Sequence, residues 1–150
     1  AKLHLSLGEV EEARSVLQKG LALFGGGSAN NSNNYNVYVS SRGRNANVAF
    51  LAHTLALIEL NWNNNPTRAK SVLEQGLWHC ASSSQLLLAM ALSESRLGHD
   101  SAARSMFEKS LMADQCHAQA WQAFGVMEMR AGNFKAAKTL FECGLKNSPT

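Results

Sequence analysis

Several features that mark secreted, membrane-spanning or metal-binding proteins are missing from this chain of 150 residues. It has only three cysteines, an odd number, and no Cys-x-x-Cys, so neither a disulfide framework nor a zinc finger is supported. No apolar run approaches the roughly 18 residues of a membrane-spanning helix, and no signal peptide is visible at the start. These absences predict an intracellular protein with no membrane span in this stretch of chain.

Catalytic motifs are missing as well. The chain has no Gly-rich phosphate loop followed by Lys-Ser/Thr, and no nucleophile elbow. His79-Cys80 and Cys116-His117 could meet and bind a metal, but their spacing matches no known zinc pattern. We therefore expect no catalytic residue, no metal site, no cofactor and no small-molecule substrate.

What the chain does have is an internal repeat. The string Ala137-Lys138-x-x-Phe141-Glu142-x-Gly144-Leu145 has a counterpart that begins at Ala103, 34 residues earlier, and another that begins at Ala69. A fourth copy begins at Ala13, 56 residues before the third, so one connection holds about 22 extra residues. Four copies in one phase indicate a helical-repeat protein.

The string has a physical reason. Small residues seven positions apart share one helix face and let a neighbouring helix approach closely, while Phe or Leu between them fills the remaining space. One helix pair cannot bury its apolar face alone and must stack on the next. The sequence therefore predicts an all-α solenoid of stacked antiparallel helix pairs without strands. The positions expected to pack are Ala13, Leu17, Gly20, Ala69, Leu73, Gly76, Ala103, Phe107, Ser110, Trp121, Gly125, Ala137, Phe141 and Gly144.

The repeat divides the chain into about three and a half units, which we expect to be a fragment of a longer array. The predicted parts are residues 1–24 (a partial repeat), 25–46 (an insertion) and three repeats at 47–81, 82–115 and 116–150. The insertion is rich in Gly, Asn and Ser, and such a segment buries too little apolar area to order itself. It is either a neutral expansion of a surface loop or a flexible arm that contacts RNA through Tyr35, Tyr38, Arg42 and Arg44.

Local signals predict where helices begin and end. We expect a turn at Gly8, first helices at 47–62, 84–97 and 117–130, and second helices at 9–23, 66–79, 100–113 and 134–147. Asn65 is expected to cap a helix whose first residue is Pro66, and Asn133 to cap the last helix. In each repeat, a glutamate near the end of the first helix should pair with a cation of the facing second helix. The expected pairs are Glu59 with Lys70, Glu94 with Arg104 and Glu128 with Lys138.

In stacked helix pairs the first helices line the inner face, so function should lie there. Positions counted from the glutamate that recurs near the end of each first helix (Glu59, Glu94 and Glu128) place polar side chains on that face. Such side chains can bind the bases or phosphates of single-stranded RNA. The candidate RNA-binding residues are His53, Asn61, Gln85, Arg96, Gln119, Gln122 and Arg130. A peptide would instead use Phe50, Leu88 and Met129 on the same face. The net charge of +3 tolerates nucleic acid without arguing for it.

A family resemblance favours the RNA hypothesis. Residues 118–149 match the tetratricopeptide pattern at Trp121, Gly125, Ala137, Phe141 and Pro149. Trp121, followed by an aromatic three residues on and an acid seven residues on, resembles the half-a-tetratricopeptide (HAT) variant. The chain looks closest to plastid HAT-repeat factors, and this resemblance implies a non-catalytic scaffold in RNA processing that binds, protects or matures chloroplast messengers. Spliceosomal and RNA 3′-end-processing factors share the repeat, so a nuclear location is the alternative. The alternative function is a protein–protein scaffold that binds a peptide or a partner's helix.

Overall fold

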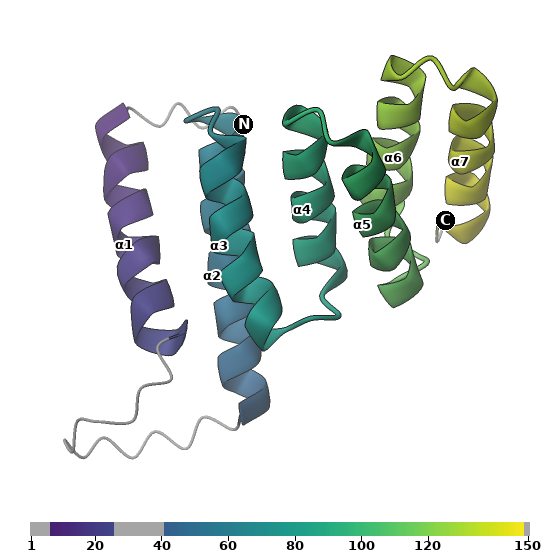
Figure 1. Cartoon of the computed structure of the whole chain (residues 1–150). Coiled ribbons are helices and arrows are strands. Elements are labelled where there is room, and N and C mark those ends of the chain that lie inside the picture. The colour runs from purple at the N-terminus through teal and green to yellow at the C-terminus, as the bar shows by residue number, and fades with distance from the viewer. Residues whose placement is uncertain (1–6, 26–40, 149–150) are drawn as a thin grey trace. The chain divides into compact units, whose positions relative to one another are not determined.

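The repeating pattern of small and apolar residues folds into paired helices. In a computed structural model, which describes residues 7–25 and 41–148, those residues form seven helices and no strand. The helices are α1 (Leu7–Gly25), α2 (Ser41–Asn61), α3 (Pro66–His79), α4 (Ser84–Arg96), α5 (Asp100–Ala113), α6 (Ala118–Arg130) and α7 (Phe134–Asn147). The prediction of an all-α fold built from antiparallel helix pairs is confirmed (Figure 1). None of the described helices is long and apolar enough to cross a membrane.

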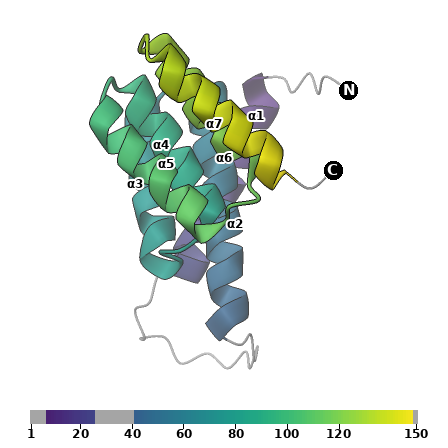
Figure 2. The same cartoon turned by 90° about the vertical axis from the view of Figure 1, so that its right-hand side faces the viewer.

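The chain divides into two units, which we call the N-terminal unit (Ala1–Ala81) and the C-terminal unit (Ser82–Thr150). In the N-terminal unit, α2 pairs with α3, and α1 lies beside α2. In the C-terminal unit, α4 pairs with α5 and α6 with α7, and α5 lies against α6 (Figures 1 and 2). The second helices of successive repeats are therefore α1, α3, α5 and α7.

Turn chemistry fixes the ends of the helices. The side chain of Asn65 accepts a hydrogen bond of 3.1 Å from the Arg68 backbone N–H, and Pro66 is the first residue of α3, as predicted. Gly98 and Gly132 adopt the left-handed region at φ values of 81° and 83°. In the longer turn after α2, Asn64 takes that conformation at φ 48°.

Three predictions about the helix ends were wrong. Helix α2 begins at Ser41 rather than Asn47, so its first six residues come from the segment predicted as a disordered insertion. The remainder of that segment, residues 26–40, lies outside the described residues, and so do Tyr35 and Tyr38. Gly8 lies in the first turn of α1, which begins at Leu7 and has Glu9 in the same turn, so it does not form the predicted turn between two helices. Asn133 occupies the predicted N-cap position of α7, but its side chain makes no capping hydrogen bond and donates to Glu128 instead.

The core of the C-terminal unit includes two of the predicted packing positions, Ala103 and Phe107. Phe107 of α5 stacks on Phe124 of α6, with ring centroids 5.0 Å apart and planes 6° from parallel. The buried cluster around them contains Leu88, Ala91, Ala103, Phe107, Leu111, Ala120, Phe124 and Met127. The buried apolar residues of the N-terminal unit are Val10, Val48, Ala52, Leu55, Ala56, Leu60, Ala69, Val72 and Leu73.

Small residues bring the helices of a pair close together. An added Cβ at Gly125 would lie 2.6 Å from the Phe141 ring, and one at Gly144 would lie 2.8 Å from the Cβ of Trp121. Both distances are shorter than real Cβ contacts allow. Glycine at these two positions is therefore required by the approach of α7 to α6.

Candidate functional site: two equivalent grooves

Three buried glutamates, Glu59, Glu94 and Glu128, recur near the ends of α2, α4 and α6. Each carboxylate is hydrogen-bonded to a residue of the turn that follows its helix. The partner of Glu59 is Asn63 at 3.0 Å, that of Glu94 is His99 at 2.8 Å, and that of Glu128 is Asn133 at 2.6 Å. The glutamate backbone carbonyls also accept N–H bonds from Asn65, His99 and Asn133. These contacts hold the turn between the two helices of each pair.

The ion pairs of these glutamates do not follow the predicted pattern. Glu128 binds Arg104 of the preceding repeat through two hydrogen bonds, rather than Lys138 of its own repeat. Glu59 pairs with Arg14, whose Nε lies 2.6 Å from Oε1 without the alignment of a hydrogen bond, and with Arg68 at 3.5 Å. Lys138 instead lies 3.9 Å from Glu142, one turn along α7. The expected pair of Glu128 with Lys138 was therefore wrong, whereas Glu59 does pair with a cation of its facing second helix, Arg68. Arg14 and Arg104, at equivalent repeat positions, each join a second helix to the first helix that follows it.

Burial and hydrogen bonding shift the pKa values of the Arg104–Glu128 pair. Hydrogen bonds from Arg104 lower the pKa of the Glu128 carboxyl, against the opposing effect of burial, and a hydrogen bond from Asn133 lowers it further. The same contact with Glu128 raises the pKa of the Arg104 guanidinium. The pair is therefore charged on both sides, and its role is structural rather than that of a proton donor or acceptor.

A second polar cluster joins three helices of the C-terminal unit. Ser84 Oγ lies 3.0 Å from Ser110 Oγ and 2.6 Å from Nδ1 of His117, and the Ser110 hydroxyl donates to the Ser84 carbonyl at 2.8 Å. This cluster satisfies polar groups at the start of α4 and just before α6. Among the described residues, no group of three or more His, Cys, Asp and Glu side chains could hold a metal ion. Cys80, Cys116 and Cys143 are free thiols.

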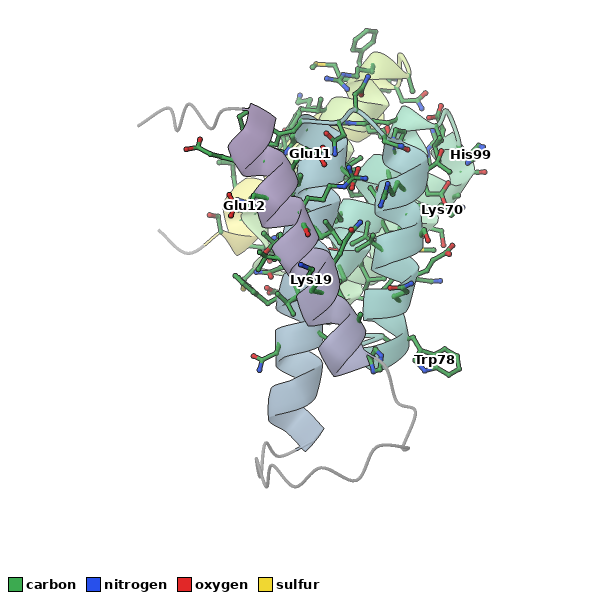
Figure 3. The ribbon with its side chains drawn as sticks, turned by 90° about the vertical axis from the view of Figure 1, so that its left-hand side faces the viewer. Glu11, Glu12, Lys19, Lys70, Trp78 and His99 are labelled. Atoms are coloured by element: carbon green, nitrogen blue, oxygen red, sulfur yellow. The ribbon has the colours of Figure 1, made fainter. Side chains whose placement is uncertain are left out.

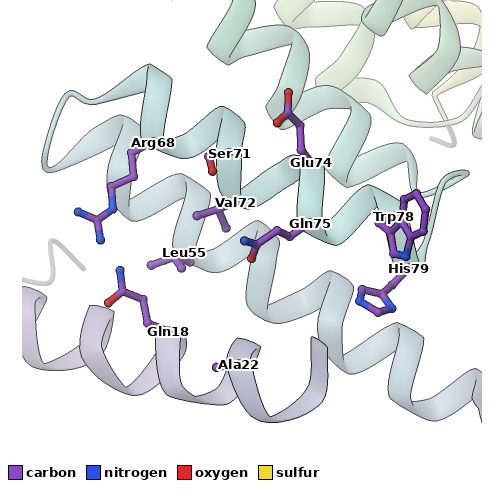
Figure 4. A pocket seen from close by; sticks show the side chains of 10 residues that line it. All are labelled: Gln18, Ala22, Leu55, Arg68, Ser71, Val72, Glu74, Gln75, Trp78 and His79. Atoms are coloured by element: carbon purple, nitrogen blue, oxygen red, sulfur yellow. The ribbon is translucent and has the colours of Figure 1, made fainter. Parts of the chain in front are cut away.

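The N-terminal unit carries an open groove between its two second helices. The groove has a volume of about 970 Å³ and lies between α1 and α3, with Leu55 of α2 in its floor (Figure 4). Its lining residues are Gln18, Ala22, Leu55, Arg68, Ser71, Val72, Glu74, Gln75, Trp78 and His79. Arg68 and Gln18 face each other near one end, whereas Trp78 and His79 lie at the other (Figure 4). The Trp78 side chain is 87% exposed and stands away from the end of α3 (Figure 3).

The C-terminal unit has a groove at the equivalent place. It has a volume of about 800 Å³ and lies between α5 and α7, with Phe124 of α6 in its floor. Residues at matching repeat positions line both grooves: Gln18 and Glu108, Ala22 and Met112, Leu55 and Phe124, Ser71 and Thr139, Val72 and Leu140, and His79 and Asn147. The C-terminal groove adds Leu111 and Trp121 and is the more apolar of the two. The same architecture therefore produces two grooves with different chemistry.

Residues predicted to bind RNA line neither groove. Asn61, Gln85, Arg96, Gln119, Gln122 and Arg130 are exposed on first helices, and His53 is half-buried. Of the side chains proposed to bind a peptide there, Phe50 and Met129 are exposed, but Leu88 is buried in the core of the C-terminal unit. Assigning Leu88 to the inner face was therefore wrong, because the apolar stripe of a first helix is wide enough to include it.

Sequence reasoning missed the grooves. Their walls come from the outer positions of second helices, such as Gln18, Ser71 and Gln75, which read as ordinary solvated residues. Trp78 was the available signal, since a tryptophan outside the repeat pattern has no packing reason to be there.

An all-α fold of antiparallel helix pairs, with a groove repeated between second helices, defines a helical-repeat fold. The structure is similar to the crystal structure of MamA, a tetratricopeptide-repeat protein, with a TM-score of 0.59, 13% identity, and coverage of 97% of this chain and 96% of MamA. A second structure, MamA MSR-1 C2, gives a TM-score of 0.57 at 10% identity and coverage of 92% and 91%. At these identities the likeness shows the fold alone.

Other comparisons add no family. No protein-family model matches the sequence. No curated protein matches it either. The resemblance to plastid HAT-repeat factors therefore receives no support from the comparisons, whereas a tetratricopeptide-like repeat fold does.

Proposed function

We propose that this chain is a protein-interaction scaffold whose N-terminal groove binds a polypeptide segment of a partner. The observation that carries the proposal is the groove between α1 and α3, which combines an apolar floor with a rim of amide and imidazole side chains. Such a surface suits a polypeptide, whose backbone needs hydrogen bonds and whose side chains need apolar cover. The likeness to a tetratricopeptide-repeat protein supports the same class of function.

The chemistry of the groove fits this occupant. Gln18 and Gln75 can both donate to and accept from a peptide backbone, and they lie on opposite walls. Leu55 and Val72 offer an apolar surface between them (Figure 4). Trp78 provides a large exposed ring at one end, and exposed tryptophans are among the residues that contribute most to protein interfaces.

Binding of single-stranded RNA to the first helices is the second candidate. Six of the seven predicted RNA-binding residues are exposed, and two of them, Arg96 and Arg130, occupy equivalent repeat positions. The HAT resemblance favours it, with the plastid as its compartment or the nucleus as the alternative. It is the weaker proposal because the sequence pattern alone supports it.

A photoreactive residue placed at two sites separates these candidates. In living cells, a photo-crosslinking amino acid at Gln75 lies in the groove, whereas one at Gln122 lies on the exposed face of α6. Adducts at Gln75 that are removed by protease and resist ribonuclease would support the protein scaffold. RNA adducts at Gln122, together with an absence of protein adducts at Gln75, would favour RNA binding over the protein-scaffold proposal.

The variant Trp78→Ala tests whether the crosslinked protein occupies the groove. We expect it to reduce the yield of the Gln75 protein adduct roughly fivefold, because truncating a contact of this kind costs about 1 kcal/mol or more. Trp62→Ala is the matched control, since Trp62 is exposed but does not line the groove. An equal loss of the adduct in both variants would argue against a role for the groove.

A further inference from the structure

One end of the N-terminal groove differs in charge from the same place in the C-terminal groove. Arg68 of α3 and Gln18 of α1 face each other there, and we call this the Arg68 end (Figure 4). At the equivalent repeat positions, the C-terminal groove is lined by Ala136 and Glu108. The same place is therefore positively charged in one groove and negatively charged in the other.

Arg68 is not needed to neutralise the buried carboxylate beside it. Glu59 already has Arg14, whose Nε lies 2.6 Å away, and a hydrogen bond from Asn63, whereas Arg68 lies at 3.5 Å. The equivalent glutamate, Glu128, is held by one arginine and one asparagine, with alanine at the position that corresponds to Arg68. The C-terminal unit thus shows that the repeat does without a second arginine.

The guanidinium of Arg68 is placed to bind an anion. It has five N–H donors, none of which makes a hydrogen bond within the described part of the chain, and the side chain is 46% exposed. Arg68 also lies in the first turn of α3, which contains no acidic residue. A cation there opposes the helix dipole, whereas a bound carboxylate is favoured by it. Charge and position both favour a carboxylate supplied by the occupant of the groove.

We propose that the Arg68 end binds an acidic side chain of the partner's polypeptide segment, while an apolar side chain of the same segment covers Trp78 at the other end. The inference rests on the proposed function, because it specifies which segment the groove accepts. We assign the carboxylate to a side chain because the groove is open at the surface and does not require the partner's chain to end in it.

Helix geometry gives the spacing of these two side chains. Arg68 and Trp78 are ten residues apart on α3, which is about 15 Å along the helix axis. An extended polypeptide covers that distance in roughly four to five residues. Glu74, the acidic residue of the lining, lies about 9 Å along α3 from Arg68 and so leaves the Arg68 end positive.

The photoreactive residue at Gln75 tests the proposal in the full chain. Arg68→Ala should reduce the yield of the protein adduct about fivefold, as expected for an ion pair at a partly exposed site. Arg68→Glu should reduce it about tenfold or more, because attraction becomes repulsion. Lys19→Ala is the matched control: it removes a positive charge next to Gln18 but outside the groove lining, and should change the yield less than twofold. The melting temperature of Arg68→Ala should equal that of wild type.

The crosslinked segment itself provides a second test. Mass spectrometry of the adduct should find an Asp or Glu four or five residues from an apolar residue. Changing that acid to lysine in the partner should remove the adduct with the wild-type chain and restore it with Arg68→Glu. A role of Arg68 in folding alone would not produce this exchange.

The possible failures are distinguishable. An adduct yield that is unchanged in Arg68→Glu, or lowered equally by Lys19→Ala, would overturn the carboxylate site and leave the groove proposal in place. A crosslinked segment without an acidic side chain, or one whose only carboxylate is its C-terminus, would do the same. Absence of any protein adduct at Gln75 in the otherwise wild-type chain would instead remove the proposed function, and this inference with it.

Discussion

At the scale of single residues, buried glutamates decide how one repeat is joined to the next. Glu128 is buried, and its carboxylate binds both Arg104 and Asn133. A buried carboxylate is costly unless such partners compensate for the lost water. The glutamate therefore has to be satisfied by the turn of its own repeat and the arginine of the repeat before, which couples helix pairs.

Arg104→Met tests this coupling. Since it leaves the Glu128 carboxylate buried with Asn133 as its remaining partner, we expect unfolding in urea to lose about 1–3 kcal/mol. We take this range rather than the larger cost of a fully buried pair because the Arg104 side chain is 36% exposed. Lys138→Met, the same repeat position on α7, is the control and should stay within about 0.5 kcal/mol. Similar losses in both variants would contradict the proposed role of the pair.

The lowered pKa of Glu128 predicts how stability depends on pH. A carboxyl whose pKa is lower in the folded state stabilises the fold fully above its unfolded value, about 4.3, and this contribution is lost as pH falls through the folded value. Wild type should therefore be more stable than Glu128→Gln at pH 7, and the difference should shrink as the pH falls below about 4. Urea unfolding of both proteins between pH 7 and 3 measures it. A difference that stays constant over this range would show that the charge of Glu128 is not what stabilises the fold.

At the scale of helices, one position of the repeated string sets how closely a second helix approaches its partner. That position is occupied by Gly20, Gly76, Ser110 and Gly144. At Gly144, an added methyl group would meet the Cβ of Trp121, which cannot move without the backbone of α6. At Gly20, the nearest atom belongs to α2, the first helix of the next repeat: it is a terminal methyl of Leu51 at 3.2 Å, which can rotate away.

Gly144→Ala should therefore destabilise the protein although alanine favours helices. We expect a net loss of about 1–3 kcal/mol from overpacking in thermal or urea unfolding. Gly20→Ala, at the same repeat position, should be neutral or stabilising by up to about 1 kcal/mol because its helix propensity is higher. A stabilising effect at Gly144 would mean that α7 and α6 lie further apart than described.

At the scale of the whole molecule, the repeat produces the same groove twice with different linings. The N-terminal groove has Gln18, Gln75 and His79 around Leu55, whereas the C-terminal groove has Leu111, Trp121 and Leu140 around Phe124. Repeat architecture fixes where a groove lies, and the variable outer residues of second helices fix what it accepts.

Salt dependence distinguishes the two classes of ligand for the whole chain. Polypeptide binding in the N-terminal groove should weaken only slightly between about 50 and 200 mM salt. The reason is that the positive charge of Arg68 and the negative charge of Glu74 offset each other in the groove lining. Binding of RNA across the exposed first helices should fall steeply over the same range, because neutralised phosphates release counterions. Fluorescence anisotropy with the crosslinked partner segment or RNA measures this, and a steep salt dependence of polypeptide binding would contradict the groove proposal.

The sequence by itself determined the all-α fold, the register of the repeat and most helix ends, because these depend on local patterns. Small and apolar residues at fixed spacing, Asn65 before Pro66, and glycine at the turns act within a few residues of each other. Only the tertiary structure decided that Glu128 binds Arg104 rather than Lys138, that Leu88 is buried, and that Gln18 and Gln75 face one groove. The physical reason is that all three depend on which neighbouring helix lies beside a given side chain. Spacing along one helix does not contain that information.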